Sequence, residues 1–299
     1  MNAGIVYATL AFAMWGLFPL YLRHIAMVPP LEVVLHRSVW SLCFLLGVLA
    51  VLRRFDWLGD LKSQPRRLAL FSLSALLLSC NWLLYVYAVQ SGQVVEASLG
   101  YFINPIVNVL LGVLVLKERL NHVQWAAVAL AAAGVLWLTL LAGRLPWIAL
   151  VLAVSFGFYG LMRKTATLGA LEGLTLETLL LAPLVVPLLA WWSFSGNGVM
   201  AQGDWALNGW LLLAGPLTAL PLLLFGAGAR RLPLATIGLI QYLSPTIQLA
   251  LGVWVFHEPF DRERLLGFVL IWSALALYSA DGWRRSRREL PQAAGVRIR

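Results

Sequence analysis

Long apolar stretches, each of about 20 residues, dominate this 299-residue chain. Lipid offers no hydrogen bonds, so a segment that crosses it must satisfy its own backbone groups, and a helix of this length does so. We identify ten such stretches, near residues 4–22, 32–52, 68–90, 97–116, 123–141, 146–163, 174–193, 209–229, 233–256 and 265–281. They predict an all-α integral membrane protein with ten transmembrane helices.

Composition agrees with a lipid environment. Apolar residues make up 61% of the chain and charged residues 12%, against about 25% in soluble domains, which excludes an ordinary soluble enzyme and a disordered chain. The net charge of +9 comes from short basic runs between apolar stretches, so a nucleic-acid partner is not expected. Cys43 and Cys80 lie within apolar stretches and are expected to be buried thiols. We expect no cofactor and no metal.

The distribution of Lys and Arg predicts the orientation of the helices. With the N-terminus inside, 17 of these residues fall in inner loops and the tail, and 4 in outer loops, when the intramembrane Arg37 is left out. Positive residues favour the cytoplasmic side, so both termini should be cytoplasmic. The basic tail, residues 283–299, is expected to be disordered.

A shift of 140 residues reveals an internal repeat. PIVNVLLGVLVLKE at 105–118 aligns with PTIQLALGVWVFHE at 245–258, with identical residues at six of fourteen positions, including Pro, Gly and Glu. We predict two five-helix repeats, 1–143 and 144–282. Because five is odd, the second repeat should be inverted in the membrane, an arrangement that secondary transporters use to expose a central site to either side in turn.

Polar residues occupy matching positions on one face of the fourth and ninth stretches. They are Tyr101, Asn104 and Asn108 in the first repeat, and Gln241, Ser244 and Gln248 in the second. Pro105 and Pro245 each free a backbone carbonyl one turn earlier. Intramembrane polar groups line wet cavities or pair with each other, so these faces predict either a substrate cavity or interhelical hydrogen bonds.

The second stretch places Glu32, His36 and Trp40 on one helical face, with Arg37 beside it. Arg37 could bind a carboxylate or extend to the lipid headgroups. His36 could carry a proton or act as a hydrogen-bonding partner. Arg37 aligns with Glu177 under the shift, and we expect the two about 15 Å apart, unpaired, each at the gate on its own side. His36 and Glu177 are the candidates for proton coupling or gating.

Aromatic residues complete the candidate site. Trp15, Tyr85 and Tyr101 could stack on a substrate or lie at the lipid interface. The substrate-binding candidates are Trp15, Arg37, Trp40, Asn81, Tyr85, Tyr101, Asn104, Asn108, Gln241, Tyr242, Ser244 and Gln248. Glu118 and Glu258 are expected to make helix-end or loop contacts. The chain lacks HExxH, GxSxG and Walker A motifs, so no enzymatic activity is expected.

Several segments resemble the RarD-type branch of the EamA family, in the drug/metabolite transporter superfamily. They include YFINPIVNVLLGVLVLKERL at 101–120, ATIGLIQYLSPTIQ at 235–248, FGFYGLMRK at 156–164 and ETLLLAP at 177–183. The resemblance runs from about Trp15 to Tyr278. It implies a bacterial inner-membrane transporter with ten helices in two inverted repeats around a cavity. Relatives export amino acids, other metabolites and drugs, and the branch name is associated with chloramphenicol sensitivity.

The sequence thus predicts a secondary transporter of small organic metabolites or drugs, with an amino-acid-like or aromatic substrate and export as the direction. A channel or facilitator without ion coupling is the alternative, and a membrane-embedded enzyme or a sensor is less favoured. The expected partners are the lipid bilayer, a small molecule and a coupled proton, with the chain as a monomer or weak homodimer.

Overall fold

The computed structural model describes residues 2–59, 64–91, 94–141, 143, 147–196, 198–202, 204–255 and 262–295. The helices are α1 (Ala3–His24), α2 (Pro30–Leu52), α3 (Pro65–Gln90), α4 (Val94–Leu114), α5 (His122–Leu141), α6 (Trp147–Thr165), α7 (Ala170–Phe194), α8 (Trp205–Ala229), α9 (Leu234–Ile240), α10 (Leu243–Trp254) and α11 (Arg262–Gly295). Short 3-10 turns are η1 (Asp56–Leu58) and η2 (Val199–Gln202).

These helices confirm the all-α membrane architecture. Eight segments are long and apolar enough to cross a membrane, with α9 and α10 counted together. Two shorter apolar segments, Gly100–Leu114 in α4 and Leu265–Asp281 in α11, complete the ten stretches expected from the sequence. The basic tail differs from expectation, because α11 continues to Gly295 instead of ending with its apolar stretch. Residues 296–299 lie outside the described part of the chain.

The ninth stretch is broken into two helices, α9 and α10. Pro245 has no backbone N–H, so it cannot bond the carbonyl of Gln241 one turn earlier. That carbonyl instead accepts a tighter bond from the N–H of Ser244 at 3.1 Å. In the first repeat, α4 continues through Pro105. The two prolines align in sequence, yet only the second one interrupts its helix.

The packing follows the predicted repeat. The starts of α2 and α7, at residues 30 and 170, lie 140 residues apart, and the starts of α3 and α8, α4 and α9, and α5 and α11 have the same spacing. α1 packs on α8, and its counterpart α6 packs on α3. Likewise α4 packs on α6, and its counterparts α9 and α10 pack on α1. In these two cases, replacing each helix of a packed pair by its counterpart in the other repeat gives another packed pair.

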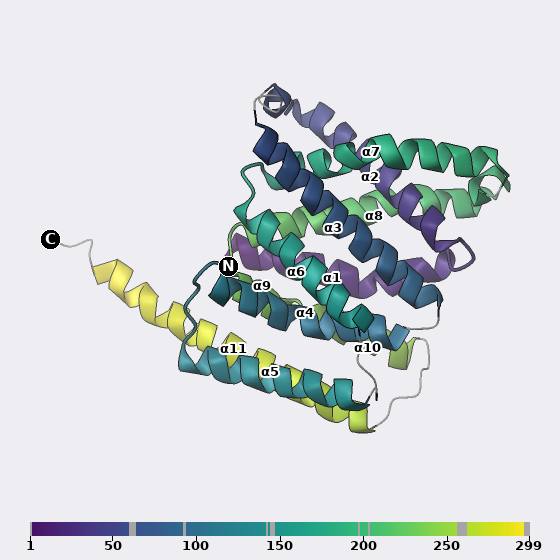
Figure 1. The fold of residues 1–299 in the computed structure, drawn as a ribbon. Coiled ribbons are helices and arrows are strands. Elements are labelled where there is room, and N and C mark those ends of the chain that lie inside the picture. Colours follow the sequence, from purple (N-terminus) through teal and green to yellow (C-terminus); the bar gives the residue numbers. More distant parts are fainter. Residues whose placement is uncertain are drawn as a thin grey trace.

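The two repeats run in opposite directions. In Figure 1, α1 starts at the left of the bundle, whereas α6 starts at the right and runs back to the left. We call the end where α1 begins the basic end, because α2, α3, α6 and α8 bring Arg and Lys residues to it: Arg53, Arg54, Arg66, Arg67, Lys164, Arg230 and Arg231. The opposite end is the far end. α11 extends past the bundle at the basic end.

The outside of the bundle is apolar, as a lipid-facing surface requires. Exposed side chains include Leu10, Leu17, Leu73, Leu76 and Leu136. Cys43 and Cys80 are also exposed, so the expectation that they are buried was wrong. In a membrane helix an apolar sequence context does not distinguish the interior from the lipid-facing side.

The backbones of α2 and α8 approach closely at Gly215. A Cβ atom at this position would clash with the backbone carbonyl group of Trp40. The Ser41 hydroxyl donates a hydrogen bond to the Gly215 carbonyl at 3.1 Å. Small residues allow such close approach between membrane helices.

We predict that Gly215→Ala lowers the free energy of unfolding by about 1–3 kcal/mol, because the backbone of α2 must move away. Thermal unfolding in detergent measures the effect. Gly209→Ala is the matched control on the same helix, because a Cβ there meets nothing within 4 Å. Equal melting temperatures for the two variants would show that the α2–α8 contact is not close-packed.

Candidate functional site

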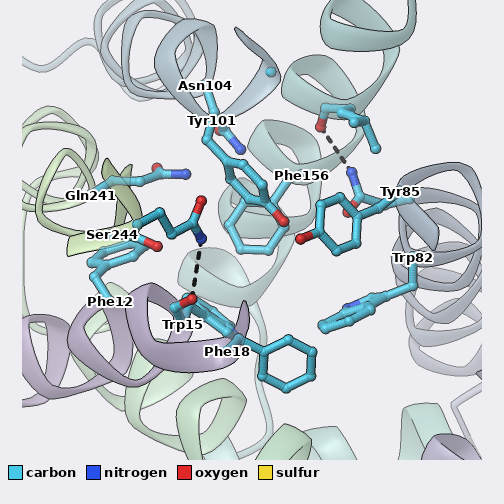
Figure 2. A pocket seen from close by; sticks show the side chains of 14 residues that line it. Phe12, Trp15, Phe18, Trp82, Tyr85, Tyr101, Asn104, Phe156, Gln241 and Ser244 are labelled. Carbon is cyan, nitrogen blue, oxygen red and sulfur yellow. Dashed lines mark hydrogen bonds between the residues drawn. The ribbon is translucent and has the colours of Figure 1, made fainter. Parts of the chain in front are cut away.

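A cavity of about 680 Å³, including its mouth, lies between the two repeats. Its lining comes from α1, α3, α4, α6 and the region where α9 meets α10. Figure 2 shows these side chains converging on one space. The lining residues are Phe12, Trp15, Phe18, Asn81, Trp82, Tyr85, Gly100, Tyr101, Asn104, Leu152, Phe156, Gln241, Ser244 and Gln248. We call this space the central cavity.

The central cavity brings together eight of the twelve candidate substrate-binding residues. They are Trp15, Asn81, Tyr85, Tyr101, Asn104, Gln241, Ser244 and Gln248. Arg37, Trp40, Asn108 and Tyr242 lie outside its lining. The sequence interpretation missed the aromatic residues Phe12, Phe18 and Phe156, and it did not select Trp82. Phe12 and Phe18 lie three residues before and after Trp15, which is the spacing of one helical face.

Half of the residues that line the central cavity are aromatic, and several of their rings pack edge to face. Trp15 meets Phe156 with ring centroids 5.6 Å apart and an interplanar angle of 82°. Tyr85 and Tyr101 are 5.5 Å apart at 74°, and their hydroxyl groups face each other. Such pairs restrict each other's orientation. The wall is therefore a set of mutually supported rings.

Three polar atoms at the central cavity are buried and have no hydrogen-bond partner within the described chain. They are Nε1 of Trp15, Oδ1 of Asn104 and Oγ of Ser244. An unpaired buried polar group costs about 1–3 kcal/mol, so a ligand that pairs with it removes that cost. Asn81 is already engaged, because its Nδ2 donates to Leu152 and Ser155. Gln248 donates to the Trp15 carbonyl at 3.2 Å.

The lining of the central cavity carries no Asp, Glu, Lys, Arg or His among the residues that the structure describes. An anion placed here would have no counter-charge and would meet the electron-rich faces of the rings. A cation would be attracted by those faces. The cavity therefore suits a molecule without net negative charge.

Asn108 and Gln241 tie the two repeats together beside the central cavity. Nδ2 of Asn108 donates to Oε1 of Gln241 at 2.9 Å. Both side chains are buried, at 0% and 2% exposure. At the same crossing, a Cβ at Gly238 would lie 2.7 Å from the Pro105 carbonyl oxygen. Of the two roles considered for Asn108, cavity lining and interhelical hydrogen bonding, the structure shows the interhelical hydrogen bond.

Tyr242 makes a hydrogen bond to another helix, and Trp40 makes one within its own helix. The Tyr242 hydroxyl donates to the Phe102 carbonyl at 3.2 Å. Nε1 of Trp40 donates to Nδ1 of His36 at 3.1 Å. Nε2 of His36 lies 3.6 Å from Oε1 of Glu32, and the same oxygen accepts the N–H of Val199 at 2.7 Å. This face of α2 thus holds η2 at the far end.

Arg37 lies behind the cavity wall. Its side chain is 6% exposed, so it does not extend to the headgroups. Its Cζ atom lies 4.4 Å from the centroid of the Trp82 ring. A small cavity of about 360 Å³ is lined by both Arg37 and Glu177, whereas we expected separate gates for them. We call it the Arg37 cavity. Long side chains from α2 and α7 reach this shared space although their backbones start from opposite ends.

Glu177 is 1% exposed and is surrounded by polar partners. Its Oε1 accepts a 2.6 Å hydrogen bond from Ser74 and lies 3.5 Å from Nη1 of Arg163. Its Oε2 accepts from the Tyr159 hydroxyl at 3.5 Å. Among the described residues no ion pair joins Arg37 to Glu177, as predicted.

Arg163 pairs with Glu177. It is one of the 17 positive residues that the sequence analysis assigned to the inner loops and tail, but it is 1% exposed. It fits between α7 and α8 because Gly173 and Gly226 leave room. A Cβ at Gly226 would lie 2.8 Å from Nη2 of Arg163, and a Cβ at Gly173 would clash with Nη1. Arg163 occupies the last turn of α6. Sequence counting could not show that α7 and α8 cover this turn.

At the basic end, Glu118 joins α4 to the start of α9. Its carboxylate accepts the N–H groups of Leu234 at 2.8 Å and Ala235 at 3.2 Å. Lys164 lies 3.7 Å from the same carboxylate. A carboxylate is favourable at the positive end of a helix. Glu118 therefore makes the expected helix-end contact, while Glu258 lies outside the described residues.

Comparisons with known proteins identify the family. The model of the EamA-like transporter family matches residues 2–140 and 145–280. An uncharacterized transporter of Pseudomonas aeruginosa is 46% identical, with 98% of each chain covered. Protein RarD of Streptomyces exfoliatus is 44% identical over 96% of this chain and 91% of its own.

A more distant relative in Pseudomonas aeruginosa, named chloramphenicol-sensitive protein RarD, is 32% identical, with 96% of each chain covered. A solved crystal structure shares the fold, with a TM-score of 0.69 and a sequence identity of 16%. The match covers 95% of this chain and 99% of the other chain. The repeat architecture, the family match and these full-length relatives agree. The chain belongs to the EamA-like transporter family, as a RarD-type membrane transporter.

Proposed function

We propose that this transporter is a secondary carrier that moves small organic molecules through the central cavity by alternating access. The observation that carries the proposal is a partly polar cavity enclosed between two inverted repeats and closed at one end. Inverted repeats allow two conformations in which the closed end changes. The distribution of Lys and Arg supports an orientation in a bacterial inner membrane with the basic end and both termini cytoplasmic, and export is the direction we propose.

The position of the central cavity supports a conformation closed at the basic end. Its lining residues on α4 and α6, from Gly100 to Asn104 and from Leu152 to Phe156, lie in the halves of these helices nearest the far end. On the side of the basic end, the ring of Phe156 packs on that of Phe225 in α8, with ring centroids 5.3 Å apart. The capping of α9 by Glu118 completes the closure at the basic end.

The lining of the central cavity supports an aromatic substrate that is uncharged, zwitterionic or cationic. A flat ring can stack on the aromatic wall. A carboxylate or carbonyl oxygen can accept from Nε1 of Trp15, and an amine or hydroxyl can donate to Oδ1 of Asn104. Chloramphenicol, which appears in the name of one relative, is uncharged and combines a ring with hydroxyl and amide groups. Arg37 is not assigned a role with a substrate carboxylate, because it lies behind Trp82.

We predict that binding depends on the charge of an aromatic ligand. Chloramphenicol, L-phenylalanine and phenethylamine should raise the melting temperature of the purified protein, whereas phenylacetate should not. The physical reason is the absence of a positive side chain in the described lining. Stabilisation by phenylacetate equal to that by phenethylamine would contradict the proposed substrate class.

We also predict that Trp15→Phe weakens L-phenylalanine binding by about 3- to 10-fold, because it keeps a ring but removes the Nε1 donor. Equilibrium dialysis with radiolabelled ligand measures the change. Trp125→Phe, on the exposed surface of α5, is the matched control and should bind as the unmodified protein does. Unchanged binding by the Trp15 variant would remove this donor from the site.

A carrier and a channel predict different exchange behaviour. In proteoliposomes preloaded with unlabelled L-phenylalanine, we expect accelerated entry of the radiolabelled compound, because a loaded carrier reorients in both directions. A channel would show no such counterflow. Flux that is independent of internal substrate would favour the channel.

A further inference from the structure

A second cavity opens at the basic end between α3 and α6, with about 700 Å³ of empty space when its open mouth is included. Arg66 and Arg67, on the first turn of α3, lie at its outer part. Phe71 and Met162 form apolar walls, and Ser74 and Glu177 lie deepest. We call it the basic-end vestibule. It is separate from the central cavity, because no residue in the described part of the chain lines both.

Glu177 is the one residue that lines both the basic-end vestibule and the Arg37 cavity, among the residues that the structure describes. The charged and titratable groups around it come from three neighbouring helices. α6 contributes Tyr159 and Arg163, α2 contributes Arg37, and α3 contributes Arg66 and Arg67 in the vestibule. α8 contains no titratable side chain.

The partners of Glu177 suit both protonation states of its carboxyl group. A hydroxyl can donate to a carboxylate and can accept from a carboxylic acid, so Ser74 and Tyr159 can remain bonded in either state. Arg163 is held independently of Glu177, because its Nη2 donates to the Ala170 carbonyl at 2.9 Å. The glycines on either side also restrict its movement. Neutralising Glu177 would therefore keep these hydrogen bonds, while the buried Arg163 cation would lose its counter-charge at 3.5 Å.

His36, the other candidate, is in a different position. It lines none of these three cavities and is 1% exposed between Glu32 and Trp40. None of the three cavities therefore leads to His36. Of the two candidates, only Glu177 lines one of these cavities.

Two contacts connect Glu177 with the wall of the central cavity. Tyr159 packs on Phe156 with ring centroids 5.7 Å apart, and Phe156 lines the central cavity. On the other side, Arg37 covers one face of Trp82, which also lines the central cavity. A change in charge at Glu177 thus acts on Tyr159 and Arg37, each of which contacts a ring in the wall of the central cavity.

We propose that Glu177 is a proton-binding site supplied through the basic-end vestibule, with Arg163 as its positioning residue. The role of this site in coupled transport rests on the proposed function, whereas its existence does not. The reaction is a reversible proton transfer between water in the vestibule and the carboxylate. No other bond is made or broken.

Infrared difference spectroscopy between acidic and neutral pH tests proton binding directly in lipid nanodiscs. We expect the carbonyl-stretch band of a buried carboxylic acid to appear on acidification, to be lost in Glu177→Gln and to shift in Glu177→Asp. Glu172→Gln is the matched control on the same helix, because Glu172 pairs with Arg54 at the surface. An unchanged band in both Glu177 variants, or no band in the unmodified protein, would leave the Glu177–Arg163 pair with a structural role alone and overturn the proposal.

Cysteine labelling tests the access route in a protein that keeps Glu177. Met162→Cys is made in a background with Cys43→Ser and Cys80→Ser, because both native thiols are exposed. A membrane-impermeant methanethiosulfonate reagent should label it from the basic end and not from the far end of oriented vesicles. Labelling from the far end alone, or none, would refute the vestibule route. Neither experiment requires a transport substrate, so failure of the proposed substrate class remains distinguishable.

Discussion

The crossing of α4 with the α9–α10 region is the contact on which the central cavity depends. Asn108 donates to Gln241 at 2.9 Å, and Gly238 lets the backbone of α9 approach Pro105. Pro105 and its counterpart Pro245 are both buried and are not exposed to lipid. In an apolar solvent an unpaired amide is costly, so a pair of amides at this depth specifies how the repeats meet.

The break at Gln241 and Tyr242 gives the second repeat a different local structure from the first. The helix restarts at Leu243, which leaves Gln241, Ser244 and Gln248 around the central cavity while Tyr242 points to the backbone of α4. Discontinuous helices near the middle of the membrane are a feature of transporter binding sites, where irregular backbone borders a cavity. The asymmetry between α4 and α9–α10 thus supports the proposed carrier mechanism.

Charge is kept out of the central cavity and concentrated behind its wall. Arg37, Arg163 and Glu177 are all buried, yet none of them lines that cavity. They lie among α2, α3, α6, α7 and α8, separated from the central cavity by Trp82, Phe156 and Tyr159. This separation allows the proposed substrate site, made of rings and amides, to coexist with a buried ionisable cluster.

The amino-acid sequence by itself determined the ten apolar stretches, the 140-residue repeat, the inversion and most of the polar cavity residues. These features follow from local rules: segment length, periodicity and the parity of the helix count. Only the tertiary structure decided that Asn108 bonds Gln241, that Arg163 is buried beside Glu177 and that Arg37 covers Trp82. Each of these depends on which helices become neighbours, and a helical face does not state whether it meets lipid, a cavity or another helix.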